Sequence, residues 1–152
     1  MPVFFGGLIE DFNARVSPMM RMIGALISSS LVFFWLNIKI DELGFENIDY
    51  LLSDYIWVSF IFTLLAVSLV INAFNIIDGF NGLMIGYSLI VSFSLAYIAN
   101  LLGDNFIFDL SLILAFSLLG LFILNFPFGK IFAGDGGAYF IGFMIAVIGL
   151  ML

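Results

Sequence analysis

The chain has 152 residues, of which 64% are hydrophobic and only 10% are charged. Soluble domains contain about 45–50% apolar residues, so a mean hydropathy of +1.25 indicates an integral membrane protein. The formal net charge of -7, with only four Lys and Arg residues, excludes a basic surface for nucleic acid. The chain has no cysteine and no histidine, so a bound cation would be held by Asp, Glu and Asn oxygens.

Four apolar segments approach the length of a membrane-spanning helix, which is about 20 residues. In chain order they are Met19–Ile40, Ile56–Ile77, Met84–Leu102 and Phe108–Phe126. Val3–Ile9 and Tyr139–Leu152 are apolar but shorter, and we interpret them as partial helices, with re-entrant or interfacial segments as the alternative. We expect an all-α, polytopic transmembrane helix bundle with four full spans and a partial helix at each end. Residues 1–152 would form one domain, the central part of a longer protein.

The basic residues predict the orientation of these spans. Arg15, Arg21 and Lys130 fall in breaks on one side of the membrane, and Lys39 alone falls on the other. The side that is richer in Lys and Arg is usually cytoplasmic. Most acids fall on the opposite, outer side: Asp41, Glu42, Glu46, Asp49, Asp54 and Asp104.

A smaller group of acids emerges on the cytoplasmic side, from three separate parts of the chain. Glu10 and Asp11 precede the first full span, Asp78 follows the second, and Asp135 follows the fourth. Carboxylates that gather at one surface repel each other unless a cation lies among them, and a hard divalent ion with oxygen ligands fits such a site. We expect Mg²⁺, with Mn²⁺ as a substitute. The alternative is that each acid is a solvated loop or helix-end residue.

Two polar stretches interrupt the apolar pattern on this side. In NAFNIIDGFNGL, which covers Asn72–Leu83, the polar residues Asn72, Asn75 and Asp78 recur every three positions and share one helix face. That face would line a wet cavity or the bundle interior. Gly82 and Gly86, in the spacing GxxxG, permit close packing of the next helix.

The second polar stretch is FPFGKIFAGDGGAYFIGF, at Phe126–Phe143. Glycines and backbone N–H groups at a helix N-terminus form an anion site, and a lysine adds a point charge for phosphate. We therefore predict phosphate binding by Lys130, Gly134 and Gly136. The alternative is a plain glycine-rich turn in which Asp135 caps the helix.

Three stretches in this order resemble the polyprenyl-phosphate N-acetylhexosamine-1-phosphate transferases: GGLIEDFNARVSP, NAFNIIDGFNGL and NFPFGKIFAGDGGAYFIGF. The family includes the bacterial phospho-N-acetylmuramoyl-pentapeptide transferase and the undecaprenyl-phosphate N-acetylglucosamine-1-phosphate transferase. The resemblance implies a bundle of about ten spans of the usual membrane length. It also implies attack by a polyprenyl-phosphate oxygen on the β-phosphate of a UDP-N-acetylhexosamine, with release of UMP.

The resemblance assigns roles to individual residues. Catalytic roles fall to three acids: Glu10, Asp11 and Asp78. Mg²⁺ would be held by Asp135 and Asp78, and the nucleotide sugar by three asparagines: Asn72, Asn75 and Asn81. Glu10 stands where many members have Asp, and Asn81 where many have a further Asp.

The resemblance also predicts partners and location. The partners would be the bilayer, a polyprenyl phosphate of the undecaprenyl type and a UDP-N-acetylhexosamine, with a homodimer as a candidate assembly. The protein would lie in a bacterial inner membrane with a cytoplasmic active site. Because a histidine-containing loop of the family is missing, we expect these residues alone to be inactive. Two alternatives are an ion channel or transporter subunit and a non-catalytic remnant or scaffold.

Overall fold

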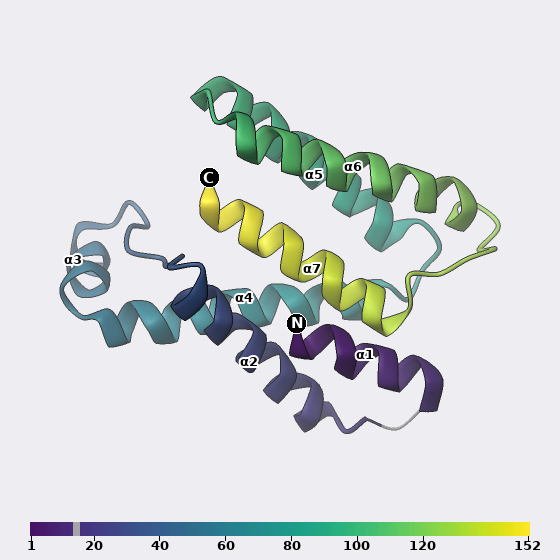
Figure 1. Cartoon of the computed structure of the whole chain (residues 1–152), viewed down its shortest axis with the longest axis horizontal. Helices are drawn as coiled ribbons and strands as arrows, with labels where there is room; N and C mark the ends of the chain where they lie inside the picture. The colour runs from purple at the N-terminus through teal and green to yellow at the C-terminus, as the bar shows by residue number, and fades with distance from the viewer. Residues whose placement is uncertain (14–15) are drawn as a thin grey trace.

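A computed structural model describes residues 1–13 and 16–152 of the chain (Figure 1). Arg15, one of the residues on which the expected orientation depends, lies outside the described residues. The described residues form seven helices and no strand. The helices are α1 (Pro2–Asn13), α2 (Pro18–Trp35), α3 (Glu46–Asp54), α4 (Ile56–Ile77), α5 (Leu83–Leu102), α6 (Asn105–Asn125) and α7 (Gly134–Met151). The all-α prediction is therefore confirmed.

Five of these helices are long and apolar enough to cross a membrane: α2, α4, α5, α6 and α7. The prediction of four full spans was wrong for the last segment, which was expected as a partial helix. Helix α7 begins at Gly134 and runs for 18 residues, which is about 27 Å at about 1.5 Å per residue. Glycine is a poor helix former, so Gly134–Gly137 resembles a loop in sequence, but tertiary contacts with α1 hold it in the helix.

The first full span is shorter than expected, because α2 ends at Trp35 instead of continuing to Ile40. Beyond it the chain lies beside α4. The Ile40 backbone N–H donates to Thr63 Oγ1 at 2.9 Å, and Ser59 Oγ donates to the Ile40 carbonyl at 2.7 Å. These side chains of α4 satisfy backbone groups that would otherwise lie unpaired at the membrane boundary. The short helix α3 follows on the same end of the molecule (Figure 1).

Helix α7 is the centre of the bundle. In an 18-residue apolar stretch of α7, 56% of the residues are buried inside the molecule. The corresponding share in the other candidate spans is 28–33%. It contacts α1 and α4 most extensively, and it also packs against the hairpin of α5 and α6. Within that hairpin, Gly82 and Gly86 both face α6, where Cβ atoms on them would meet Phe126 and Phe122. The GxxxG spacing thus marks a helix contact, as predicted.

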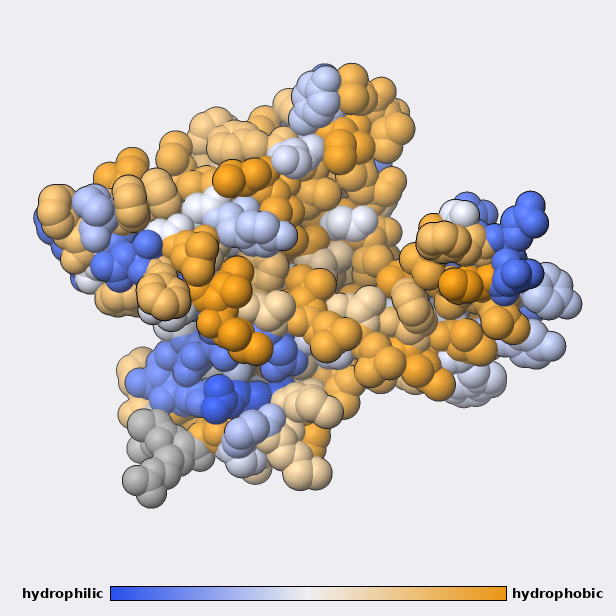
Figure 2. Space-filling model, turned by 180° about the vertical axis from the view of Figure 1, so that it is seen from behind, coloured by the Kyte–Doolittle hydropathy of each residue, from blue (hydrophilic) through white to orange (hydrophobic). Residues whose placement is uncertain are grey.

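The helices alternate in direction, and their ends form two polar regions. In Figure 1 the right-hand end holds the C-terminal end of α1, the α4–α5 turn and the α6–α7 loop. The opposite end holds α3 and the α5–α6 turn. Figure 2 shows two hydrophilic regions at opposite ends of the molecule, separated by a mostly hydrophobic surface. This arrangement is that of a multi-pass membrane protein.

We expect single-cysteine labelling to place the two ends on opposite sides of the membrane. The chain has no native cysteine, and Phe80 and Asn47 are exposed at opposite ends. In intact cells an impermeant thiol reagent should label Asn47→Cys, and it should label Phe80→Cys only after permeabilisation, because the end with Lys130 is expected to be cytoplasmic. Labelling of both positions in intact cells would contradict this orientation.

Candidate active site

The acidic end of α1 contacts the first turn of α7 through one carboxylate. Asp11 Oδ1 accepts a hydrogen bond from the Asp135 backbone N–H at 2.8 Å, and Asp11 Oδ2 accepts one from the Gly136 N–H at 3.1 Å. The two helices come close enough that a Cβ on Gly7 would lie 2.6 Å from the Gly136 Cα. Residues separated by more than a hundred positions in sequence therefore share one site.

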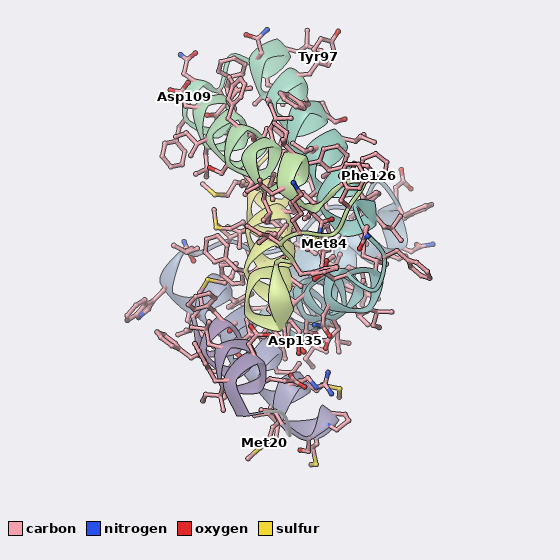
Figure 3. All side chains as sticks on the ribbon, turned by 90° about the vertical axis from the view of Figure 1, so that its right-hand side faces the viewer. Met20, Met84, Tyr97, Asp109, Phe126 and Asp135 are labelled. Carbon is pink, nitrogen blue, oxygen red and sulfur yellow. The ribbon has the colours of Figure 1, made fainter. Side chains whose placement is uncertain are left out.

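Helix α4 reaches the same site through Asn75. Asn75 Nδ2 donates to Asp135 Oδ1 at 2.6 Å, and within residues 1–13 and 16–152 the second oxygen of Asp135 accepts no hydrogen bond. Figure 3 shows Asp135 at the end of α7 that faces the viewer. Asp135 lies in the first turn of α7, and the N-cap residue, Ala133, makes no side-chain capping bond. The alternative in which Asp135 caps its own helix is therefore not what the structure shows.

Asp78 follows the last residue of α4 and is half-buried near the same carboxylates. Burial raises the pKa of Asp78 from 3.8 to about 6, and the negative charges of Asp135 and Asp11 add to the shift. Three acids from α1, α4 and α7 thus influence one another electrostatically. A cation among them would relieve this repulsion.

The raised pKa of Asp78 predicts a pH dependence of stability. The folded protein binds this proton more tightly than the unfolded chain, so the stabilisation is fully present below about pH 4 and is lost as the pH rises through about 6. Without divalent cations, the melting temperature in detergent should fall more for the wild type than for Asp78→Asn between about pH 5 and about pH 7. Equal slopes for the two proteins would contradict the raised pKa.

Glu10, the other member of the acidic pair, faces α2. Arg21 Nη2 lies 3.3 Å from Glu10 Oε1, and both side chains are partly buried. Burial raises the pKa of Glu10 above its usual range, the negative charge of Asp135 adds to this, and Arg21 opposes it. In the sequence, Arg21 served only to predict which side of the membrane is cytoplasmic. A cation in the first turn of a span is itself a signal for function.

Asn125, at the end of α6, is a second residue that sequence reasoning missed. It is only 2% exposed. Its Oδ1 accepts from the Gly82 N–H at 2.5 Å, and its Nδ2 donates to the Ile131 carbonyl at 2.7 Å. Asn125 therefore ties the α4–α5 turn to the α6–α7 loop. The signal that identified Asn72, a polar residue near the end of an apolar span, also applies to Asn125.

The remaining predicted residues lie around this centre or apart from it. Asn72 donates to the Ser68 carbonyl within α4 at 2.7 Å, and the exposed Asn81 donates to the Pro127 carbonyl at 3.4 Å. Lys130 is exposed and takes part in neither ion pair found among the described residues. The structure thus brings together Asp11, Asn75, Asp78, Asp135, Gly134 and Gly136.

The donor set of this centre fits Mg²⁺. Within residues 1–13 and 16–152 no group of three or more acids forms a ready-made metal cage. Mg²⁺ rarely needs one, because it is usually bound by one or two carboxylates and completes its shell with water and substrate phosphates. The second oxygen of Asp135 and the carboxylate of Asp78 are ligands of the kind that Mg²⁺ takes.

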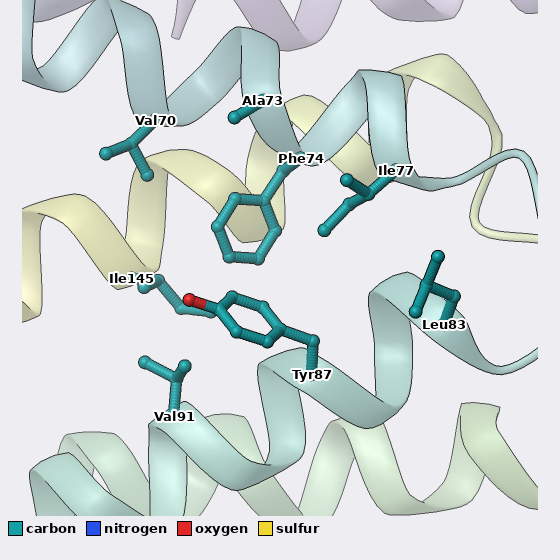
Figure 4. Close-up of a pocket in the computed structure, with 8 residues that line it drawn as sticks. All are labelled: Val70, Ala73, Phe74, Ile77, Leu83, Tyr87, Val91 and Ile145. Carbon is teal, nitrogen blue, oxygen red and sulfur yellow. The ribbon is translucent and has the colours of Figure 1, made fainter.

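An apolar groove begins beside the acidic centre. Its volume is about 480 Å³, and helices α4, α5 and α7 line it (Figure 4). The lining residues are Val70, Ala73, Phe74, Ile77, Leu83, Tyr87, Val91 and Ile145. Phe74 and Tyr87 face each other with ring centroids 5.8 Å apart. Because Ile77 precedes Asp78 directly, the apolar groove and the acids adjoin.

Comparison with known proteins decides the family. The model of glycosyl transferase family 4 matches residues 1–152, which is the whole chain. The chain belongs to glycosyl transferase family 4. The resemblance of the three polar stretches to polyprenyl-phosphate N-acetylhexosamine-1-phosphate transferases is therefore confirmed.

Named transferases are similar to this chain of glycosyl transferase family 4. A probable undecaprenyl-phosphate N-acetylglucosaminyl 1-phosphate transferase of Bacillus subtilis is 38% identical over 95 residues, covering 62% of this chain and 26% of the relative. A phospho-N-acetylmuramoyl-pentapeptide-transferase of Staphylococcus carnosus is 38% identical over 81 residues, or 53% and 25% of the two chains.

A longer match covers nearly all of this family 4 chain. A putative UDP-N-acetylglucosamine–dolichyl-phosphate N-acetylglucosaminephosphotransferase of Saccharolobus solfataricus is 32% identical over 160 residues, which covers 97% of this chain and 46% of the relative. The chain thus spans less than half the length of these relatives.

Proposed function

We propose that this chain carries the acidic centre of an enzyme that transfers an N-acetylhexosamine-1-phosphate from a UDP-sugar to a polyprenyl phosphate. The observation that carries the proposal is the convergence of Asp11, Asn75 and Asp135 from three helices at one end of the bundle. Relatives named for undecaprenyl-phosphate and dolichyl-phosphate substrates support it. The centre would lie at the cytoplasmic face of a bacterial plasma membrane, and the lipid-linked product would serve cell-wall or O-antigen synthesis.

The proposed reaction is a phosphoryl transfer between a lipid and a nucleotide. An ionised oxygen of the polyprenyl phosphate forms a bond to the β-phosphorus of the UDP-sugar. The bond from that phosphorus to the bridging oxygen breaks, and UMP leaves with the electron pair. Such reactions depend mainly on positioning and on neutralising the charge of the phosphates.

Different parts of the chain would bind the lipid, hold the metal and attract the nucleotide. The apolar groove of Figure 4 offers the prenyl chain a surface, and one of its lining residues, Ile77, directly precedes Asp78. Asn75 orients the Asp135 carboxylate by its 2.6 Å hydrogen bond. Mg²⁺ held by Asp78 and Asp135 would supply positive charge at the diphosphate. Lys130, exposed on the α6–α7 loop, lies at the same end and would attract the nucleotide.

A UMP-release assay tests this function. Membranes with the protein expressed from its complete reading frame should release UMP only when Mg²⁺, polyprenyl phosphate and a UDP-N-acetylhexosamine are all present. UDP-N-acetylglucosamine and UDP-N-acetylmuramoyl-pentapeptide should be compared as donors, and the lipid product identified by mass spectrometry. No UMP with either donor, or release that does not need the lipid, would contradict the proposal.

A further inference from the structure

The N-terminus of α7 is capped from another helix. The first backbone N–H groups of a helix have no partner within it, and a side chain just before the helix usually accepts them. Ala133, the N-cap of α7, has no side chain that could do so. The acceptor is instead Asp11 of α1, 124 residues away from Asp135 in sequence, which binds the N–H groups of Asp135 and Gly136 with its two oxygens.

The space for this carboxylate depends on glycines. A Cβ on Gly134 would lie 2.8 Å from Asp11 Oδ2, and one on Gly136 would lie 3.3 Å from the same atom. Gly134 also has a φ of 69°, which favours glycine. A side chain at either position would push the carboxylate away from the helix end. The glycine-rich start of α7 therefore leaves the space that the Asp11 carboxylate occupies.

We propose that Asp11 is a positioning residue, which fixes the first turn of α7 and thereby the place of Asp135. The proposal rests on the proposed function and changes the catalytic role that the resemblance implied for Asp11. Both carboxylate oxygens accept backbone N–H groups of α7, so the hydrogen bonds that the structure gives Asp11 are those of a helix cap. Asn75 fixes the Asp135 side chain, and Asp11 fixes the backbone that carries it.

Hydrogen–deuterium exchange tests the cap without any need for activity. In Asp11→Asn, one amide oxygen can still accept an N–H, but the NH₂ group meets a second donor, so half of the cap is lost. Exchange of the amides at residues 135 and 136 should rise at least about tenfold, because protection follows local opening. Peptides from the α5–α6 hairpin should not change. Asp11→Ala, which removes both acceptors, should give a larger rise.

Asp135→Asn is the matched variant, because it leaves the Asp11 carboxylate and both backbone N–H groups in place. It should lose turnover without faster exchange. Asp11→Asn should instead show faster exchange, with kcat lower by about tenfold, the KM for the nucleotide sugar near its wild-type value and the same acidic limb of the pH profile. Loss of a catalytic base would remove that limb.

Two outcomes are decisive. Unchanged exchange at residues 135 and 136 in both Asp11 variants would overturn the proposal, and so would a kcat loss of about a hundredfold or more in Asp11→Asn together with a changed pH profile. A different result tests the proposed function. If the wild-type protein releases no UMP, the transferase assignment is wrong, while faster exchange in the Asp11 variants would still establish the cap.

Discussion

Asp135→Asn is expected to lower UMP release by at least about two orders of magnitude, which corresponds to the loss of several kcal/mol of charge stabilisation. Asparagine keeps the shape of the side chain and an oxygen that can accept from Asn75. It removes the charge that a hard cation requires. The measurement is kcat in membranes across a Mg²⁺ titration, with the amount of protein determined by immunoblot. Asp78→Asn should impair turnover as well.

Asp104→Asn is the control at the opposite end of the bundle. Asp104 is the N-cap of α6, and its Oδ1 accepts from the Ile107 N–H at 2.9 Å. Asparagine caps helices about as well as aspartate, so this variant should keep nearly normal turnover and stability. If Asp135→Asn behaved like Asp104→Asn at every Mg²⁺ concentration, Asp135 would not hold the metal.

Gly7→Ala is expected to have the second largest effect, although it adds only one methyl group. The new Cβ would lie 2.6 Å from both the Cα and the N of Gly136, and neither backbone atom can move aside as a flexible side chain would. The α1 and α7 helices must separate, which should cost about 1–3 kcal/mol, the usual range for overpacking. Asp11 moves with α1, so turnover should fall at least about tenfold. Thermal unfolding in detergent and UMP release measure the two effects.

Gly6→Ala is a matched control one residue away. A Cβ on Gly6 would meet no atom within 4 Å. Replacing glycine by alanine inside a helix is neutral or stabilising by up to about 1 kcal/mol. The two variants therefore differ only in which face of α1 carries the methyl group. Equal melting temperatures and equal activities for Gly6→Ala and Gly7→Ala would show that the close approach of α1 and α7 is not required.

Asp135→Asn and Gly7→Ala together separate the effect of charge from the effect of position at this site. Asp135→Asn removes a charge and leaves the backbone contacts between α1 and α7 unchanged, so its melting temperature should stay near that of the wild type. Gly7→Ala leaves every acid present and displaces the helix that carries Asp11. If both variants lose activity but only Gly7→Ala loses stability, Asp135 acts through its charge and the α1–α7 contact acts by holding the site in place, as the hydrogen bonds indicate.

The sequence by itself determined the class of protein, most of the spans and the residues around which the site forms. Apolar segments of about 20 residues indicate membrane-spanning helices, and the expected Ile56–Ile77 agrees with α4 residue for residue. Asn75, Asp78 and Asp135 were found because ionisable and polar groups that border a span are costly and are usually retained for function. These signals are local, so they can be read without knowing how the helices pack.

Only the tertiary structure decided which predicted residues meet. Asp11 and Gly136 are 125 residues apart in sequence, and no periodicity shows that a carboxylate of α1 caps α7. That contact holds Gly134–Gly137 in a helix, against the low helix propensity of glycine, and so turns the expected partial helix into a fifth candidate span. The pairing of Arg21 with Glu10 and the bridge made by Asn125 likewise arise from packing between distant segments. Hydropathy places each residue at a depth in the membrane, but only helix packing selects its neighbours.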